Sequence, residues 1–243
     1  MMKIPTLQGI IKRRLLINFR VEPQIVQKIL PVKFRPKLYK AKAIVGICLI
    51  RLEDIRPKFT PGFCGLTSEN AAHRIAVLWE NAEGETLEGV YIPRRDTDSR
   101  INATVGGRLF PGEHNRANFE IARQQNEIRF AMESEDKKIA VKLTGRIAAE
   151  LPPTSIFPSL DEASEFFKPG SLGFSVTRDA QYLDGVRLET KTWKVDALEI
   201  DYVCSSFYED ETIFPRGSIE FDHALIMQNI AHEWHNAPRF ELK

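Results

Sequence analysis

The chain has 243 residues, of which 43% are hydrophobic and 28% are charged, a balance typical of a globular protein that buries its own core. Its 34 basic and 33 acidic side chains leave a net charge of +1, which excludes a general electrostatic attraction to nucleic acid or to an anionic membrane. No stretch approaches the roughly 18 apolar residues that a membrane-spanning helix requires.

The cysteines and the first residues favour an intracellular setting. Cys48, Cys64 and Cys204 are odd in number and widely spaced, and they match no zinc or redox pattern. They predict free thiols in a reducing compartment. The basic start, MMKIPTLQGIIKRRLL, lacks the apolar core and cleavage site of a secretory signal. We therefore expect a cytoplasmic protein.

The first elements in chain order are a strand, a helix and a second strand. Apolar and polar residues alternate over 15–21, the period of a half-buried strand. Pro23 suits a first helical turn, and the helix that follows is expected to stop at Pro31. Residues Ala43–Leu52, AIVGICLIRL, are apolar on both faces and predict a central strand that is covered on both sides.

Strand patterns dominate the rest of the chain. Alternation predicts strands over 73–79 and over Leu87–Arg94, with Pro93 marking the end of the latter. The segments 127–133 and 139–147 are joined by the short turn SEDK and predict a β-hairpin. Four further strand-like segments follow: GFSV, VRLET, WKVDALEIDYVCSSFY and SIEFDHALIM.

Two helices interrupt this pattern. DTDSRINATVGG predicts a helix with one of the residues 96–98 as its N-cap and a Gly-Gly stop. SLDEASEFFKPG contains a capping box, Ser159 with Glu162, and ends in Pro-Gly. Only 151–153, Leu-Pro-Pro, could be a seam between domains, so we expect a single domain over 1–243. Many strands with few helices indicate a closed or strongly curved antiparallel sheet.

Four segments together resemble a known family. They are INFRVEPQIVQKILPVKFRP, KAIVGICLIRLEDIRP, YIPRRDTDSRINATVGGRLFPGEHNRANF and FDHALIMQNIAHEW. In this order, from about Leu15 to Trp234, they resemble the uncharacterised YqjF-like relatives of acetoacetate decarboxylase. The resemblance implies a β-rich α+β fold, the acetoacetate-decarboxylase-like cone-shaped antiparallel β-barrel with a few short helices around a central cavity.

The resemblance also shows what the chain lacks. In the true decarboxylases a strand ends in a tyrosine, and a G-x-P-K-K loop after a helix supplies the lysine that forms a Schiff base. Tyr91 matches that tyrosine, but Pro111-Gly112-Glu113 stands where Pro-Lys-Lys would be. Between Phe59 and Asp136 every basic side chain other than histidine is arginine, which stays protonated and cannot act as an amine nucleophile. Lys142, Lys191 and Lys194 lie on strands elsewhere and could point into a cavity as a catalytic amine, but solvated surface lysine is their ordinary interpretation.

Arginines and one tyrosine are the candidate ligand-binding residues. Arg51 continues the Val45–Leu49 face and could enter the cavity, or it could mark the end of its strand. Adjacent strand residues point to opposite faces, so only one of Arg94 and Arg95 can enter a cavity, and we favour Arg94. Tyr91 and Arg108, the latter in the loop GGRLFPGEHNR, complete this set.

Three residues are the candidate catalytic groups. Glu88 could act as a general acid or base on the cavity face, or pair with an arginine on an exposed face. Glu113 and His114 occupy the place of the missing lysines, where His114 could transfer protons, or the loop could be merely solvated.

Other histidines carry less chemistry. His223 alternates with apolar residues and is interpreted as a core histidine. His232 and His235 of HEWH could share one helix face, but no third ligand is evident, so we expect no metal site and interpret the motif through Trp234 packing.

Three functions follow. The first is an enzyme without Schiff-base lysine, of lyase, hydratase or hydrolytic type, that binds a small anionic or carbonyl ligand. The second is a non-catalytic small-molecule binding protein, and the third is a structural protein with a filled interior. No phosphate loop, G-x-S-x-G elbow or basic-aromatic pattern is present, so we expect no cofactor, no nucleic acid and no membrane. A homodimer is left open.

Overall fold

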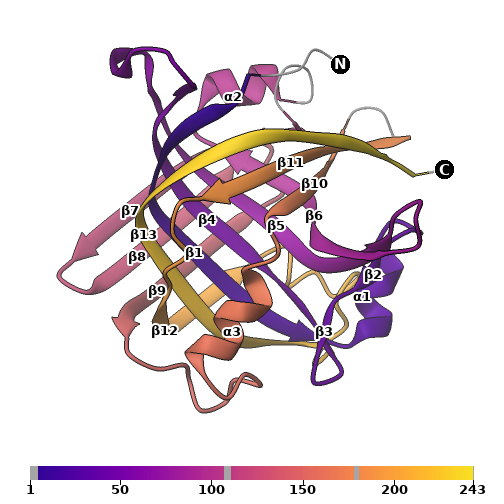
Figure 1. The fold of residues 1–243 in the computed structure, drawn as a ribbon. Coiled ribbons are helices and arrows are strands. Elements are labelled where there is room, and N and C mark those ends of the chain that lie inside the picture. Colours follow the sequence, from indigo (N-terminus) through magenta and orange to yellow (C-terminus); the bar gives the residue numbers. More distant parts are fainter. Residues whose placement is uncertain (1–4, 107–110, 178–180, 243) are drawn as a thin grey trace.

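The computed structural model describes residues 5–106, 111–177 and 181–242, which form a large sheet with few helices (Figure 1). The helices are α1 (Pro23–Ile29), α2 (Arg100–Val105), α3 (Leu160–Phe167) and the 3-10 turn η1 (Gly62–Cys64). The strands are β1 (Leu7–Val21), β2 (Arg35–Pro36), β3 (Leu38–Tyr39), β4 (Lys42–Pro57), β5 (Leu66–Glu80), β6 (Thr86–Thr97), β7 (Asn115–Gln124), β8 (Glu127–Ser134), β9 (Ala140–Ala148), β10 (Leu172–Val176), β11 (Tyr182–Thr190), β12 (Asp196–Ser205) and β13 (Ile219–Glu241).

The sheet closes into a ring-like cone. Its strand order is β11-β10-β6-β7-β8-β9-β12-β13-β1-β4-β5-β2, and the additional pairings β11–β13 and β6–β5 join distant parts of this path. The strands β13, β1, β4, β5, β6, β10 and β11 thereby form one closed circuit, within which the candidate site lies. In Figure 1, α2 lies at the upper end of the cone and α3 at the lower end.

The central strands are buried on both faces, as their apolar runs predict. Residues 43–50 of β4 are all buried, and β4 pairs with β1 on one side and β5 on the other. One face contributes to the main core through Val45, Ile47 and Leu49. The other face contributes Ile44, Cys48 and Ile50 to a second core, which also holds the phenylalanines of α3. β-branched side chains suit such a strand because they pack well on a pleated surface.

The one strand pairing predicted from the sequence, the hairpin of 127–133 with 139–147, is confirmed, but the sheet is not antiparallel throughout. The β8–β9 hairpin pairs Glu127 with Arg146 through Glu133 with Ala140. The expectation of a wholly antiparallel sheet is wrong at two ladders, because β6 pairs in parallel with β10 and, over two residues, with β7. The chain segments that lead into β7 and β10, which include α2 and α3, bring these strands back in the same direction as β6.

The predicted starts of two of the three described α-helices, α1 and α3, are confirmed. Pro23 opens α1, and the Ser159 hydroxyl accepts the Glu162 backbone N–H at the start of α3. The expected cap of α2 among residues 96–98 is wrong, because Ser99 accepts the Asn102 N–H instead. Residues 96 and 97 remain in β6, which continues past Pro93, so that strand pairing overrides the local capping preference.

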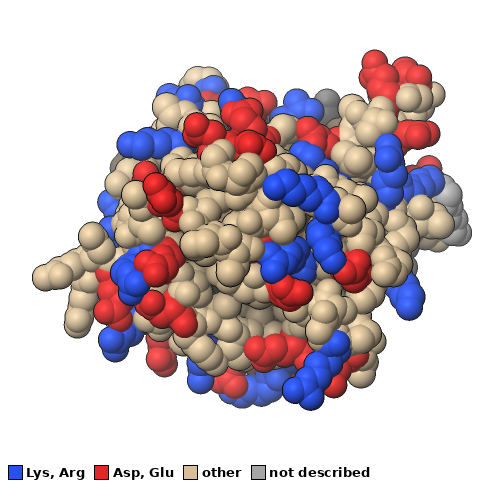
Figure 2. Space-filling model, turned by 90° about the horizontal axis from the view of Figure 1, so that it is seen from below, with Lys and Arg blue, Asp and Glu red and all other residues tan. Residues whose placement is uncertain are grey.

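The HEWH segment lies in β13, so the interpretation of a shared helix face for His232 and His235 is wrong. Residues three apart on a strand point to opposite faces. In the described part of the chain no helix is long and apolar enough to cross a membrane. On the face in Figure 2, basic and acidic side chains are interspersed, in keeping with the net charge of +1.

Candidate ligand-binding cavity

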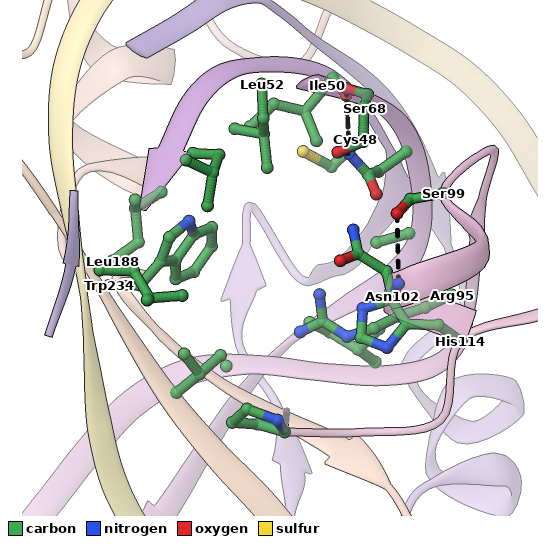
Figure 3. A pocket seen from close by; sticks show the side chains of 18 of the residues that line it. Cys48, Ile50, Leu52, Ser68, Arg95, Ser99, Asn102, His114, Leu188 and Trp234 are labelled. Carbon is green, nitrogen blue, oxygen red and sulfur yellow. Dashed lines mark hydrogen bonds between the residues drawn. The ribbon is translucent and has the colours of Figure 1, made fainter. Parts of the chain in front are cut away.

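A cavity of about 220 Å³ lies inside the closed circuit of seven strands (Figure 3). Strand alternation supplies its walls, since Cys48, Ile50 and Leu52 of β4 all point inward. Most of the lining is apolar, and Trp234 of β13 with Leu188 of β11 forms one side. Arg95, Asn102 and His114 gather on the other side. The half-exposed Ile101 of α2 marks the outer end of the cavity.

Three guanidinium groups line this cavity without an ion pair: Arg14 of β1, Arg74 of β5 and Arg95 of β6. Within the described residues their hydrogen-bond partners are neutral. Arg14 donates to Cys48 Sγ at 3.3 Å, Arg74 to Asn18 Oδ1, and Arg95 Nε to Ser175 Oγ at 2.8 Å. Elsewhere in the chain buried arginines do have carboxylates, as Arg13 does with Glu69 at 2.6 Å. None of these three charges has a carboxylate partner among the described residues, although the Arg74 guanidinium also lies over the Phe167 ring, 4.8 Å from its centroid.

Burial acts strongly on two of these arginines. It lowers the pKa of Arg95 to about 10 and that of Arg74 to about 10 as well. Both groups remain cations at neutral pH. Part of the Arg95 surface is accessible, and Figure 3 shows that this side chain faces the cavity. A nearby anion would relieve the unfavourable burial of these charges.

A bulge in β6 decides which of the two neighbouring arginines enters the cavity. The pairing of β5 with β6 shifts between His73–Arg94 and Ile75–Tyr91, so β6 holds one extra residue there. Pro93, which has no N–H for the ladder, lies inside this irregularity. Val90, Ile92 and Arg95 consequently line the cavity. Arg94 instead makes ion pairs with Asp96 at 2.7 Å and Asp136 at 3.0 Å, so strand parity misplaced it.

His114 lies beside Arg95 on the cavity wall (Figure 3). Its Nδ1 is 3.0 Å from the Gly112 carbonyl oxygen, which assigns the proton to Nδ1 and leaves Nε2 as an acceptor. Burial and the positive charge of Arg95 lower the pKa of His114 to about 3. The imidazole is therefore neutral near pH 7, and it can accept a hydrogen bond but is a weak base.

The backbone next to His114 is fixed by contacts of Gly112 with Ser175 and Asp184. Gly112 has a positive φ of 80°, and a Cβ there would lie 2.5 Å from Ser175 Cβ, so only glycine fits. The Gly112 N–H donates to Asp184 Oδ2 at 3.1 Å, and Arg239 holds the other oxygen of this buried carboxylate at 2.9 Å. Asp184 and Arg239 thus fix the loop that positions His114.

Two further candidate residues, Arg51 and Glu113, lie away from the cavity lining. Arg51 pairs with Glu53 and Glu69, on the β4 face opposite Ile50 and Leu52. Glu113 is half-buried, and its N–H donates to the Val176 carbonyl. Arg108 lies outside the described residues. Of the candidates that the structure describes, it brings only His114 to the cavity.

Tyr91 and Glu88 occupy two other environments. Tyr91 is buried in the main core, 6.0 Å from the Phe34 ring centroid, and burial raises its pKa. Glu88 forms an ion pair with Lys37 beside a much smaller cavity of about 20 Å³. The Lys37 ammonium also donates to the Phe166 carbonyl at 2.9 Å, so this lysine has its hydrogen-bond partners.

No lysine is among the described residues that line the main cavity. Lys142, Lys191 and Lys194, the lysines that could have replaced the missing amines, are all exposed. Sequence reasoning missed Arg14 and Arg74. For Arg74 the sequence did carry a signal. Ala72 and Ala76 lie on the same face of the strand on either side of Arg74, and their small side chains leave space for its guanidinium.

The remaining histidines have structural surroundings. His223 is fully buried, with Nδ1 2.6 Å from Asp222 Oδ1 and Nε2 accepting from Asn18 Nδ2 at 3.0 Å, as expected of a core histidine. His235 lies 3.3 Å from both Glu189 and Glu233. No group of three or more metal-ligating side chains is found among the residues that the structure describes.

A closed cone of strands around such a cavity is the acetoacetate-decarboxylase-like fold, and solved structures of this class share it. The acetoacetate decarboxylase of Legionella pneumophila subsp. pneumophila str. Philadelphia 1 superposes with a TM-score of 0.60 at 12% identity, covering 98% of this chain and 89% of that one. An acetoacetate decarboxylase-like enzyme from Sphingomonas wittichii RW1 gives 0.60 at 12% identity, over 99% and 94%. The enduracididine biosynthesis enzyme MppR, complexed with pyruvate, gives 0.58 at 10% identity, over 100% and 92%.

Within that class the chain belongs to the family DUF2071, an uncharacterized conserved protein family (COG2071), whose model matches residues 11–215. Among curated proteins no match to the chain was found. The identities to the solved structures are low, so these structures show the fold alone.

Proposed function

We propose that the protein binds a small organic anion with an apolar body in the cavity. One observation carries this proposal: Arg14, Arg74 and Arg95 bring three guanidiniums into a mostly apolar cavity without a carboxylate partner among the described residues. A buried charge without a partner is unfavourable, and a carboxylate that accepts from a guanidinium would remove that cost.

The shape of the lining supports the same ligand class. A carboxylate on the side of Arg95, Asn102 and His114 would direct an apolar chain toward Trp234 and Leu188. The cavity of about 220 Å³ is far larger than the roughly 10–15 Å³ that one water molecule needs. The ligand pyruvate in MppR, a small 2-oxo acid, adds carbonyl-bearing carboxylates to the candidates.

The residues favour binding over the two obvious kinds of catalysis. Imine formation requires an amine, and no described lining residue supplies one. Proton abstraction requires a base with a pKa near the working pH, whereas the pKa of His114 is lowered to about 3. A neutral imidazole beside Arg95 is better suited to orienting a ligand than to removing its proton.

The test compares hexanoate with the neutral hexanamide in a thermal-shift titration of the wild type, the Arg95→Met variant and the Arg51→Met variant. Arg51 is the control because its guanidinium is paired with Glu53 and Glu69 away from the cavity. Hexanoate should stabilise the wild type and Arg51→Met. Arg95→Met should bind it about 10–100-fold more weakly, the usual effect of losing a charged hydrogen bond.

Equal stabilisation of all three proteins by hexanoate would remove Arg95 from the site. No stabilisation of the wild type by any short-chain carboxylate would overturn the proposal.

A further inference from the structure

Cys48 lies in the cavity wall among the unpaired guanidiniums. It is in the middle of β4, where it faces inward between the strands that carry Arg14 and Arg74 (Figure 3). Its side chain is largely buried, with 8% of the residue surface exposed. Arg14 Nε donates a hydrogen bond to Cys48 Sγ at 3.3 Å. This contact places a cation directly against the sulfur.

Two further guanidiniums line the same cavity. Arg74 lies on β5, which pairs with β4 beside Cys48, and Arg95 lies on β6. The sulfur therefore shares one cavity with three guanidiniums.

Arg74 gives a separate indication that something occupies this place. Its residue is only 4% exposed, and its Nε has no hydrogen-bond partner within the described structure. It lines both the main cavity and the adjoining small one. Buried donors nearly always have partners, so an orphan donor on a cavity wall points to a ligand that supplies an acceptor.

We propose that Cys48 is a nucleophile that adds to the carbonyl carbon of a small carboxylate held by Arg14, Arg74 and Arg95, a role that rests on the anion-binding function proposed above. The thiolate sulfur attacks the carbon, a C–S bond forms, and the π electrons of the carbonyl move to its oxygen. The proton that leaves the thiol ends on this oxygen. The product is a thiohemiketal, and the addition needs no oxidant, reductant or further reactant.

This site would restore covalent capture of a carbonyl compound to a cavity that has no lysine among its described lining residues. A cysteine sulfur can add to a carbonyl carbon, whereas a guanidinium cannot. The other two cysteines lack these surroundings. Cys64 is exposed in η1, and burial together with the Glu209 carboxylate, 3.3 Å away, raises the pKa of Cys204. Both serve as internal references.

The test measures alkylation of each cysteine by iodoacetate and by iodoacetamide, with the modified peptides quantified by mass spectrometry. Iodoacetate carries a carboxylate, and iodoacetamide is its neutral counterpart. We expect the rate ratio of iodoacetate to iodoacetamide to be at least about tenfold higher at Cys48 than at Cys64. Hexanoate should protect Cys48 and leave Cys64 unaffected, and Arg14→Met should reduce the ratio. Equal ratios at Cys48 and Cys64 in the wild type would overturn the proposal without recourse to any variant.

A second measurement separates this inference from the function on which it rests. With pyruvate labelled with carbon-13 at the carbonyl, the wild type should show a new signal in the sp3 region of the NMR spectrum. Cys48→Ala should lose this signal, whereas the control Arg51→Met, altered away from the cavity, should keep both this signal and the thermal shift with hexanoate. If pyruvate competes with hexanoate but gives no new signal, the nucleophile is wrong and the anion site stands. If hexanoate does not bind at all, the proposed function itself is wrong.

Discussion

Lowering the pH from 7 to 5 should destabilise this protein sharply because buried histidines are held in environments that oppose their protonation: burial lowers the pKa of His223, and it lowers the pKa of three others by a large amount. Burial lowers the pKa of His73 to about 3, and the charge of Arg94 adds to this effect. Burial also lowers the pKa of His114 to about 3 and that of His232 to about 4, with Arg95 and Arg14 adding to the respective effects. In the unfolded chain each of these histidines would have a pKa of about 6.5.

The sign and size follow from proton linkage. Between pH 6.5 and 4 the unfolded chain binds protons at these histidines and the folded protein does not, so the free energy of unfolding falls as the pH falls. From pH 7 to pH 5 each histidine contributes a loss of about 2 kcal/mol, and the three together about 6 kcal/mol. Carboxylates with lowered pKa, such as Asp210 and Glu233, contribute their losses mainly below this window.

The assay is urea denaturation followed by circular dichroism at pH 7, 6 and 5 on the wild type and two variants. His73→Asn removes a buried imidazole whose Nε2 lies 3.2 Å from Ser205 Oγ, and His235→Gln removes a half-exposed one as the matched control. Whatever its stability at pH 7, His73→Asn should lose about 2 kcal/mol less than the wild type between pH 7 and 5. The same loss in His73→Asn and the wild type would refute the reasoning.

Three other predictions follow from single contacts. Gly112→Ala, which sets a Cβ against Ser175 and strains a φ of 80°, should displace His114 and weaken hexanoate binding in calorimetry, while Gly84→Ala, at another positive φ but in open space, should leave it unchanged. Ser159→Ala should cost about 1 kcal/mol in urea denaturation through loss of the α3 cap, and an unchanged midpoint would contradict the cap. Borohydride treatment with pyruvate should give no reduced lysine adduct, because no described lysine lines the cavity; such an adduct would show that an amine is present after all.

The fold was largely predictable because its signals are local. Period-two alternation located most of the long strands but not β7 (Asn115–Gln124) or the second half of β13. Pro23 and Ser159 located two helix starts, and the doubly apolar run at 43–50 located the centre of the sheet. The parallel partners of β6 were not predictable, since pairing direction depends on contacts between segments far apart in the chain.

The site was less predictable because side-chain direction depends on register. Strict alternation along the strand predicts that Arg94 points into the cavity. The extra residue in β6 at Pro93 shifts the alternation by one, so that Arg95 lines the cavity instead. Cys48 lay in a strand that is apolar on both faces, so no pattern could tell the cavity face from the core face. Among the candidates that the structure describes, His114 lines the cavity, and its place in the glycine-rich loop was the signal for it.

The central claim is that an apolar cavity with unpaired guanidiniums and no lysine among its described lining residues binds a small organic anion. Isothermal titration of the wild type with hexanoate and with hexanol at low salt tests it most directly. Hexanoate should bind at least about tenfold more tightly than hexanol, because only the carboxylate can accept from the guanidiniums. Equal affinity for the acid and the alcohol, or tighter binding of the alcohol, would contradict it.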